Sequence, residues 1–211
     1  MLPPVSATNN QPPGVLPALR AATGEAHQRL EDAVDIERRL ADPLRYRQLL
    51  EIFLGFYRPL ERSIPIAEHK RGLGLDLSER RKVPWLEEDL SVLGLTGPEI
   101  EQLPDCPELP RVDTPPRAMG CLYVLEGATL GGRHISAMMA RSAIPPGARR
   151  FFSGYGERTG ERWREFVAML ERDAAGLENA ESGAIIEGAQ ETFACLHRWF
   201  VRQCPADALP G

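Results

Sequence analysis

The stretch "LYVLEGATLGGRHISAMMA", residues 122–140, has the apolar spacing of a helix but contains three glycines. Each glycine in a helix interior costs about 1 kcal/mol relative to alanine. Gly127 and Gly131 are four residues apart, so they share one helix face and leave it without side chains. We therefore expect something large to lie against the bare backbone of this helix.

The 211-residue chain, 43% hydrophobic and 26% charged, has the size and composition of one globular domain. The sequence shows neither a long apolar run nor a basic N-terminal segment leading into an apolar one, so we predict a cytoplasmic protein without a membrane partner. A net charge of -5 argues against nucleic acid as a partner. The four cysteines lack C-x-x-C spacing, which predicts reduced thiols rather than a zinc knot.

Helical periodicity runs along almost the whole chain, and no stretch alternates like a strand, so the predicted fold class is all-α. Residues 1–13 are rich in proline and small polar residues, which predicts a flexible leader before a domain over 14–211. We expect helices over about 16–40, 43–64, 78–93 and 114–142, followed by two more around 163–170 and 186–200.

Several residues mark where these helices are expected to start, end or bend. Asp42-Pro43 and Thr114-Pro115 are N-cap and first-turn pairs, and Ser78 is a candidate cap for the third helix. Gly94 is a candidate C-terminal stop, and Pro59 should kink the second helix. We interpret residues 103–116 and 148–160 as irregular connections.

The first helix contains a histidine with a carboxylate one turn later. Glu31 could accept a hydrogen bond from one ring nitrogen of His27 while the other nitrogen binds a metal. Arg20 lies two turns earlier on the same face, where a guanidinium could pair with a propionate. Alone, a His–Glu pair is more often a surface contact, but beside a bare second helix it would form a slot for a flat ligand such as haem.

At this point a family resemblance becomes visible over about residues 15–202. Three stretches resemble bacterial heme oxygenases, especially the branch associated with bacteriophytochromes: "LRAATGEAHQRLE", "LYVLEGATLGGRHIS" and "FFSGYGERTGERWREF". The resemblance implies a multi-helical domain with haem sandwiched between a proximal and a distal helix. By position in the motif, His27 would be the iron ligand, Glu31 its hydrogen-bond partner and Thr23 a haem neighbour.

The same resemblance places the glycine-bearing stretch in the distal helix. Exposed main chain of the distal helix would lie close to the haem, place no acid–base side chain there and leave space for ordered water. These conditions favour opening of the porphyrin ring. Some members carry an aspartate where this chain has Ala128, so Thr129 would have to order that water. Arg133 or His134 would join Arg20 in pairing with the propionates. The implied distal residues are Gly127, Gly131, Gly132 and Thr129, with Tyr123, His134 and Met138 as haem contacts.

The implied activity is O2- and reductant-dependent cleavage of haem to biliverdin, ferrous iron and CO. Electrons would come from a ferredoxin or a flavoprotein reductase, and biliverdin would supply a bacteriophytochrome. One alternative, motivated by Ala128, is a haem-binding or haem-sensing module without turnover. Others are a cofactor-free interaction domain, in which the glycines merely let two helices approach closely, and a di-iron oxidase, for which Glu-x-x-His pairs are missing.

Overall fold

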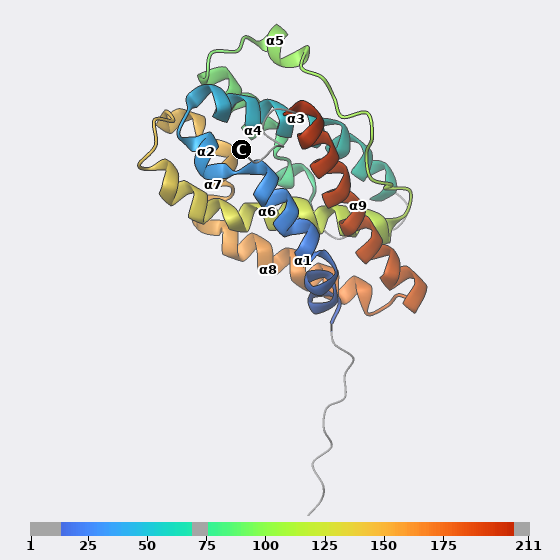
Figure 1. Ribbon diagram of the computed structural model, residues 1–211. Coiled ribbons are helices and arrows are strands. Elements are labelled where there is room, and N and C mark those ends of the chain that lie inside the picture. Colours follow the sequence, from blue (N-terminus) through green and yellow to red (C-terminus); the bar gives the residue numbers. More distant parts are fainter. Residues whose placement is uncertain (1–13, 69–75, 205–211) are drawn as a thin grey trace, which may run out of the picture.

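Helices make up the regular structure of the protein in a computed structural model that describes residues 14–68 and 76–204 (Figure 1). Within these ranges there is no strand, and the predicted all-α fold class is confirmed. The predicted leader, residues 1–13, lies outside the described residues.

Nine α-helices and three short 3-10 turns follow one another along the described chain. The α-helices are α1 (Val15–Val34), α2 (Ile36–Leu40), α3 (Pro43–Glu68), α4 (Val83–Val92), α5 (Gly97–Glu101), α6 (Pro115–Met139), α7 (Arg150–Ser153), α8 (Thr159–Ala174) and α9 (Asn179–Gln203). The turns are η1 (Ser78–Arg80), η2 (Pro146–Ala148) and η3 (Gly156–Arg158).

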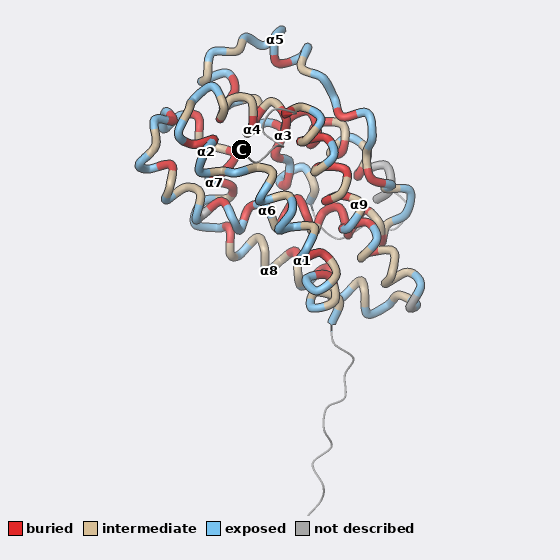
Figure 2. Tube along the Cα trace, in the orientation of Figure 1, coloured by how far each residue is buried: buried red, intermediate tan, exposed pale blue. Residues whose placement is uncertain are grey.

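The core lies between the helices, and the exposed residues follow their outer faces (Figure 2). The α3 helix contributes most of the large side chains without solvent exposure, and α8 and α9 add one phenylalanine each. These residues are Tyr46, Leu49, Leu50, Leu54, Phe56, Leu60, Phe166 and Phe200. Burial at this scale favours folding by roughly 1.5–3 kcal/mol for each large apolar side chain.

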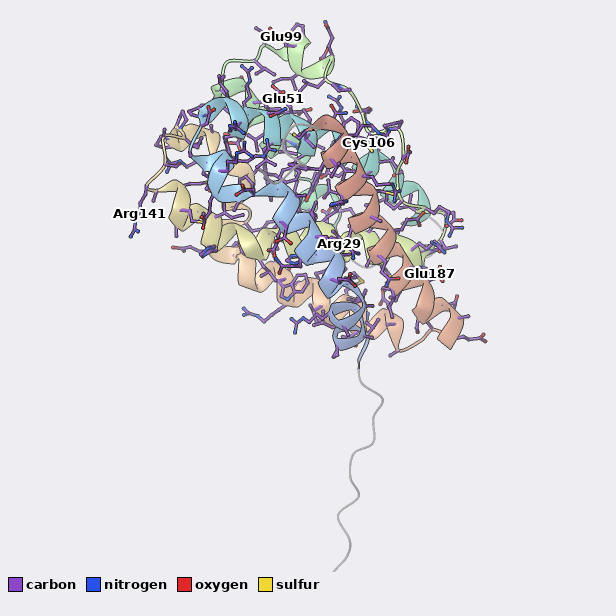
Figure 3. All side chains as sticks on the ribbon, viewed as in Figure 1. Arg29, Glu51, Glu99, Cys106, Arg141 and Glu187 are labelled. Atoms are coloured by element: carbon purple, nitrogen blue, oxygen red, sulfur yellow. The ribbon has the colours of Figure 1, made fainter. Side chains whose placement is uncertain are left out.

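The α6 and α9 helices cross with their backbones in contact. A Cβ atom on Gly120 would overlap the carbonyl oxygen of Ile185, and one on Gly188 would overlap that of Arg117. Only glycine permits this approach, because any side chain would separate the helices. Beside the crossing, Arg117 of α6 forms an ion pair with Glu187 of α9, which Figure 3 labels.

The α1 helix is attached to α8 and α9. The backbone N–H groups of Val15 and Leu16 each donate to the carboxylate of Glu171 on α8, at 3.0 Å. The Gln190 side chain of α9 donates to the carbonyl of Ala22 at 3.0 Å. The Glu171 carboxylate thus caps the N-terminus of α1, where unpaired N–H groups and the helix dipole favour an anion.

Three predicted helix boundaries are wrong: the ends of the first and fourth helices and the start of the third. The first helix ends at Val34, because Asp35 adopts a left-handed conformation (φ 43°, ψ 66°) and its side chain then accepts the N–H of Arg38 at the start of α2. The third begins at Val83 rather than at Ser78, which opens only the turn η1.

Most other boundaries agree with the sequence. The α3 helix begins at Pro43 and is assigned without a break through Pro59. Gly94 ends α4 with φ 96°: its N–H donates to Ser91, and the next N–H donates to Leu90, as in a Schellman motif. Thr114 caps α6, which ends at Met139 rather than near residue 142. The short helices α5 and α7 and the turn η3 were not predicted.

Candidate functional site

His27 projects from α1 with one ring nitrogen directed at a carboxylate. Its Nδ1 lies 3.5 Å from Oε2 of Glu31, and the two side chains are 55% and 57% exposed. The ring meets Phe193 of α9 edge to face, with centroids 5.6 Å apart. The Nε2 atom has no hydrogen-bond partner among the described residues. It is therefore free to bind a ligand.

The bare face of α6 is related to His27 through α9, which contacts both Gly120 and the histidine ring. Gly120 meets α9 beside Ala189, and Phe193 follows one turn later along α9. Gly127 and Gly131 come seven and eleven residues after Gly120, which is close to two and three helical turns. These glycines consequently share one face of α6, the face that meets α9 at Gly120.

Around Gly127 and Gly131 this face is not covered by another helix of the described chain. A Cβ atom on Gly131 would meet no described atom within 4 Å, and one on Gly127 would reach only the ring of Trp163, at 4.0 Å. Close helix approach therefore explains Gly120, but it does not explain Gly127 and Gly131.

An aromatic pair borders the open face. Tyr123, half-buried, lies next to Trp163 of α8, with ring centroids 6.1 Å apart and planes at 49°. Further along α6, His134 is exposed and Met138 is half-buried, on the same face by helical spacing. Trp163 was not predicted as a neighbour of the site, because spacing along α6 carries no information about α8.

Two of the predicted distal residues lie on other faces of α6. A Cβ atom on Gly132 would overlap the carbonyl oxygen of Phe152, so this glycine serves the packing of α7. Thr129 is 8% exposed, and its hydroxyl donates to the carbonyl of Glu126 at 2.6 Å. The structure thus separates Gly132 and Thr129 from the surface formed by Gly127 and Gly131.

The remaining candidates differ in their surroundings. Arg20 is exposed on the His27 side of α1 and forms no ion pair with a described residue. Thr23 is buried, and its hydroxyl donates to the carbonyl of Leu19 at 2.7 Å. The side chain of Arg133 is outside the described part of the structure. Arg20 is therefore a cation available to an anionic group near His27.

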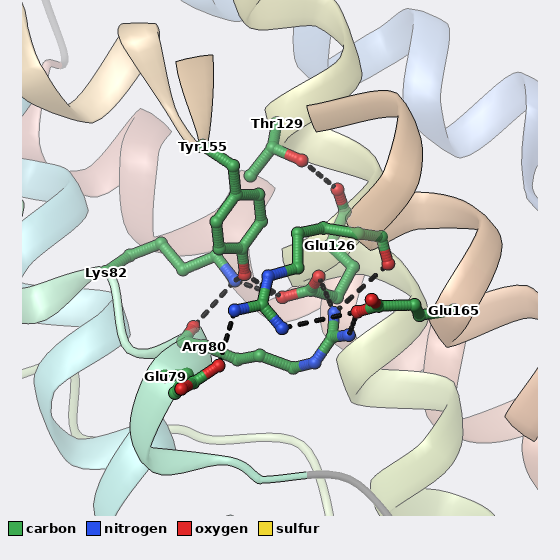
Figure 4. Close-up of polar contacts among 8 residues, drawn as sticks. Glu79, Arg80, Lys82, Glu126, Thr129, Tyr155 and Glu165 are labelled. Atoms are coloured by element: carbon green, nitrogen blue, oxygen red, sulfur yellow. Dashed lines mark hydrogen bonds and ion pairs between the residues drawn. The ribbon is translucent and has the colours of Figure 1, made fainter. Parts of the chain in front are cut away.

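A buried charged cluster beside the bare face was also missed. Glu126 of α6 receives contacts from Arg80, Lys82 and Tyr155 (Figure 4). Burial lowers the pKa of Lys82 and raises the pKa of Tyr155, which Glu126 raises further. The available signal was a single carboxylate inside the apolar run "YVLEGATL".

Two further alternatives concern metal and membrane binding. Within the described ranges, no three His, Cys, Asp or Glu side chains come close enough to hold a metal ion, so these residues offer no di-iron centre. In the same ranges, no helix combines the length and the apolar character needed to cross a membrane.

Comparison with known proteins identifies the family. The family model for heme oxygenase matches residues 14–202. The chain belongs to the heme oxygenase family. A heme oxygenase of Xanthomonas campestris pv. campestris is 38% identical over 119 residues, which are 56% of this chain and 66% of that protein. The chain thus matches just under two thirds of the length of this relative.

Solved structures of the family share the fold. The NO- and CO-bound heme oxygenase from Neisseria meningitidis superposes with a TM-score of 0.75 at 20% identity, over 90% of this chain and 92% of that one. The heme oxygenase from Leptospira interrogans gives a TM-score of 0.68 at 18% identity, over 90% of this chain and 100% of that one. The heme oxygenase-like arrangement of helices is therefore confirmed.

Proposed function

We propose that this protein cleaves haem, using O2 and an external reductant, to biliverdin, ferrous iron and CO. The observation that carries the proposal is the uncovered surface at Gly127 and Gly131, on the face of α6 that meets α9, the helix against which His27 packs. Family membership points to the same substrate. Bound haem would supply both oxygen activation and the ring that is cleaved.

The residues on the α1 side fit an axial role. His27 would bind the iron through Nε2, and Glu31 would accept the hydrogen of Nδ1, which fixes the tautomer. The 3.5 Å between Nδ1 of His27 and Oε2 of Glu31 is longer than a well-formed hydrogen bond, so this contact alone holds the ring weakly. The edge contact with Phe193 adds a second restraint on the ring. Arg20 would pair with a propionate from the same side of α1.

The residues on the α6 side fit a steric role. Backbone atoms at Gly127 and Gly131 would lie against the haem face and place no acid or base there. Tyr123 and Met138 would contact its periphery, and exposed His134 would reach a propionate.

The external partners follow from the proposed reaction. The reductant would be a ferredoxin or a flavoprotein reductase, because cleavage of haem with O2 consumes electrons. Biliverdin would then be available to a bilin-binding protein such as a bacteriophytochrome.

Hemin titration of the purified protein, followed by reductant in air, tests the proposal. A Soret band that forms and then decays while biliverdin absorption grows is the expected result. A Soret band that persists under ascorbate and under a ferredoxin–reductase system would instead establish the binding module, which Ala128 in place of an aspartate favours. Absence of a Soret band would reject both functions.

A histidine variant assigns the ligand. His27→Ala should lose the axial ligand and most turnover, with recovery on adding imidazole, because the ring is half exposed and its removal leaves the core intact. His197→Ala, a histidine of α9 outside the motif, is the matched control and should behave like wild type. Unchanged spectra in the His27 variant would exclude it as the ligand.

A further inference from the structure

Glu126 is a fully buried carboxylate placed one residue before Gly127 on α6. Its side chain is 1% exposed, and those of Arg80 and Lys82 are 2% exposed. Nη1 of Arg80 lies 2.5 Å from Oε2 of Glu126, and the Lys82 ammonium contacts Oε1. Loss of one partner from such a cluster would leave a buried charge uncompensated, which is strongly destabilising.

Further groups hold these cations in place. The Tyr155 hydroxyl lies 2.9 Å from Oε1 of Glu126 and 2.9 Å from Nζ of Lys82. Nζ also donates to the carbonyl of Arg80 at 2.7 Å, and Nη2 of Arg80 lies 3.1 Å from Glu165 of α8. Donors from η1, from the residue before α4 and from the residue before η3 therefore converge on one residue of α6 (Figure 4).

This convergence adds a directional restraint on the rotation of α6 beside a face that has no packing side chains of its own. A helix is normally held by side chains that interdigitate with its neighbours, but the Gly127–Gly131 face provides none. Successive residues are about 100° apart around a helix, so the direction of Glu126 sets the direction of Gly127. A buried ion cluster adds little net stability compared with apolar packing, but its directional bonds define one arrangement.

We infer that Glu126 is a positioning residue. Its contacts with Arg80, Lys82 and Tyr155 fix the rotation of α6 about its own axis, so that Gly127 and Gly131 present bare backbone to the haem. This role rests on the proposed function, because it matters only if haem binds against α6. The restraint on α6 itself exists in the haem-free protein as well.

Glu126→Gln tests the role because it removes the charge and keeps the shape of the side chain. Amide hydrogen exchange over residues 127–131 of the haem-free variant should be about tenfold faster than in wild type. In the haem-bound variant, we expect hemin affinity within about threefold of wild type, since His27 is untouched. The C–O stretching band of the CO complex should shift or broaden, and turnover should fall about 10- to 100-fold. Both effects are expected because a displaced Gly127–Gly131 face changes the position of the reacting groups.

Asp105→Asn is the matched control for charge removal. Asp105 pairs with buried Arg58 of α3 at 2.7 Å, and its loss should change neither exchange in α6 nor the CO band. If Glu126→Gln does not fold, Tyr155→Phe removes a single hydroxyl and should change the same measurements in the same direction, by a smaller amount. Exchange in α6 and a CO band equal to those of the control would overturn the role of Glu126.

The two proposals fail separately. Wild-type protein that binds no hemin would refute the haem-cleaving function, and hydrogen exchange in the haem-free variant would still decide whether Glu126 restrains α6. Normal wild-type turnover together with unchanged exchange and an unchanged CO band in the variant would refute the positioning role alone.

Discussion

Replacing Gly131 by leucine should stabilise the haem-free protein and weaken haem binding. Gly131 is an exposed residue inside α6, and no described atom lies within 4 Å of where its Cβ would be. Relief of the helix penalty of glycine should raise the free energy of unfolding by about 0.5–1 kcal/mol. For a chain of this size, that corresponds to a rise in Tm of about 1–4 °C.

The same side chain would occupy the space assigned to the haem. Overlap with a rigid ligand costs about 1–3 kcal/mol, so hemin affinity should fall about 5- to 150-fold. Thermal denaturation of the haem-free protein measures the first effect, and a Soret titration measures the second. Gly183→Leu on α9 is the matched control, because a Cβ atom there also meets no described atom within 4 Å. It should stabilise the helix to a similar degree and leave hemin affinity unchanged.

Two results would refute this reasoning. A lower Tm for Gly131→Leu would mean that the face is packed against protein. An unchanged hemin affinity would mean that the haem does not lie against it.

Three other substitutions have effects that the structure fixes. Gly132→Ala should lower the free energy of unfolding by about 1–3 kcal/mol in urea denaturation, because the new methyl group would overlap the carbonyl of Phe152; unchanged stability would contradict that contact. Glu171→Gln should cost about 1 kcal/mol and speed amide exchange in the first turn of α1, whereas unaltered exchange there would show that the cap is unimportant. Burial raises the pKa of Asp89 to about 6, above its ordinary value of 3.8, so the folded state binds a proton more tightly than the unfolded state and this group adds stability as the pH falls through that window. Between pH 7 and pH 5, wild type should gain about 1 kcal/mol relative to Asp89→Asn in chemical denaturation, and a constant difference would disprove the shift.

Local chemistry accounts for the boundaries that the sequence predicted. Pro43, Gly94 and Thr114 act on the backbone within a few residues, so their effects can be derived without a fold. The break at Asp35 could not be derived in this way, because a left-handed aspartate inside an apolar stripe depends on how α1 and α2 pack on their neighbours.

The site was predicted to the extent that it lies on single helices. His27 with Glu31, and Gly127 with Gly131, are related by helical spacing alone. The sequence motif gives no reason to distinguish Gly132 from its neighbour Gly131. Only the position of Phe152 in the structure shows that Gly132 faces α7. The partners of Glu126 are distant in sequence, so no local pattern could identify them.

The crossing of α6 and α9 at their glycines holds these two helices at a fixed distance. Main-chain atoms meet there directly, so the distance between the two helix axes does not depend on any rotamer and cannot adjust when core side chains reorient. A change in the position of α1 relative to α6 would leave this crossing intact, because α1 is attached at Glu171 and Gln190 by hydrogen bonds rather than by interlocked backbones.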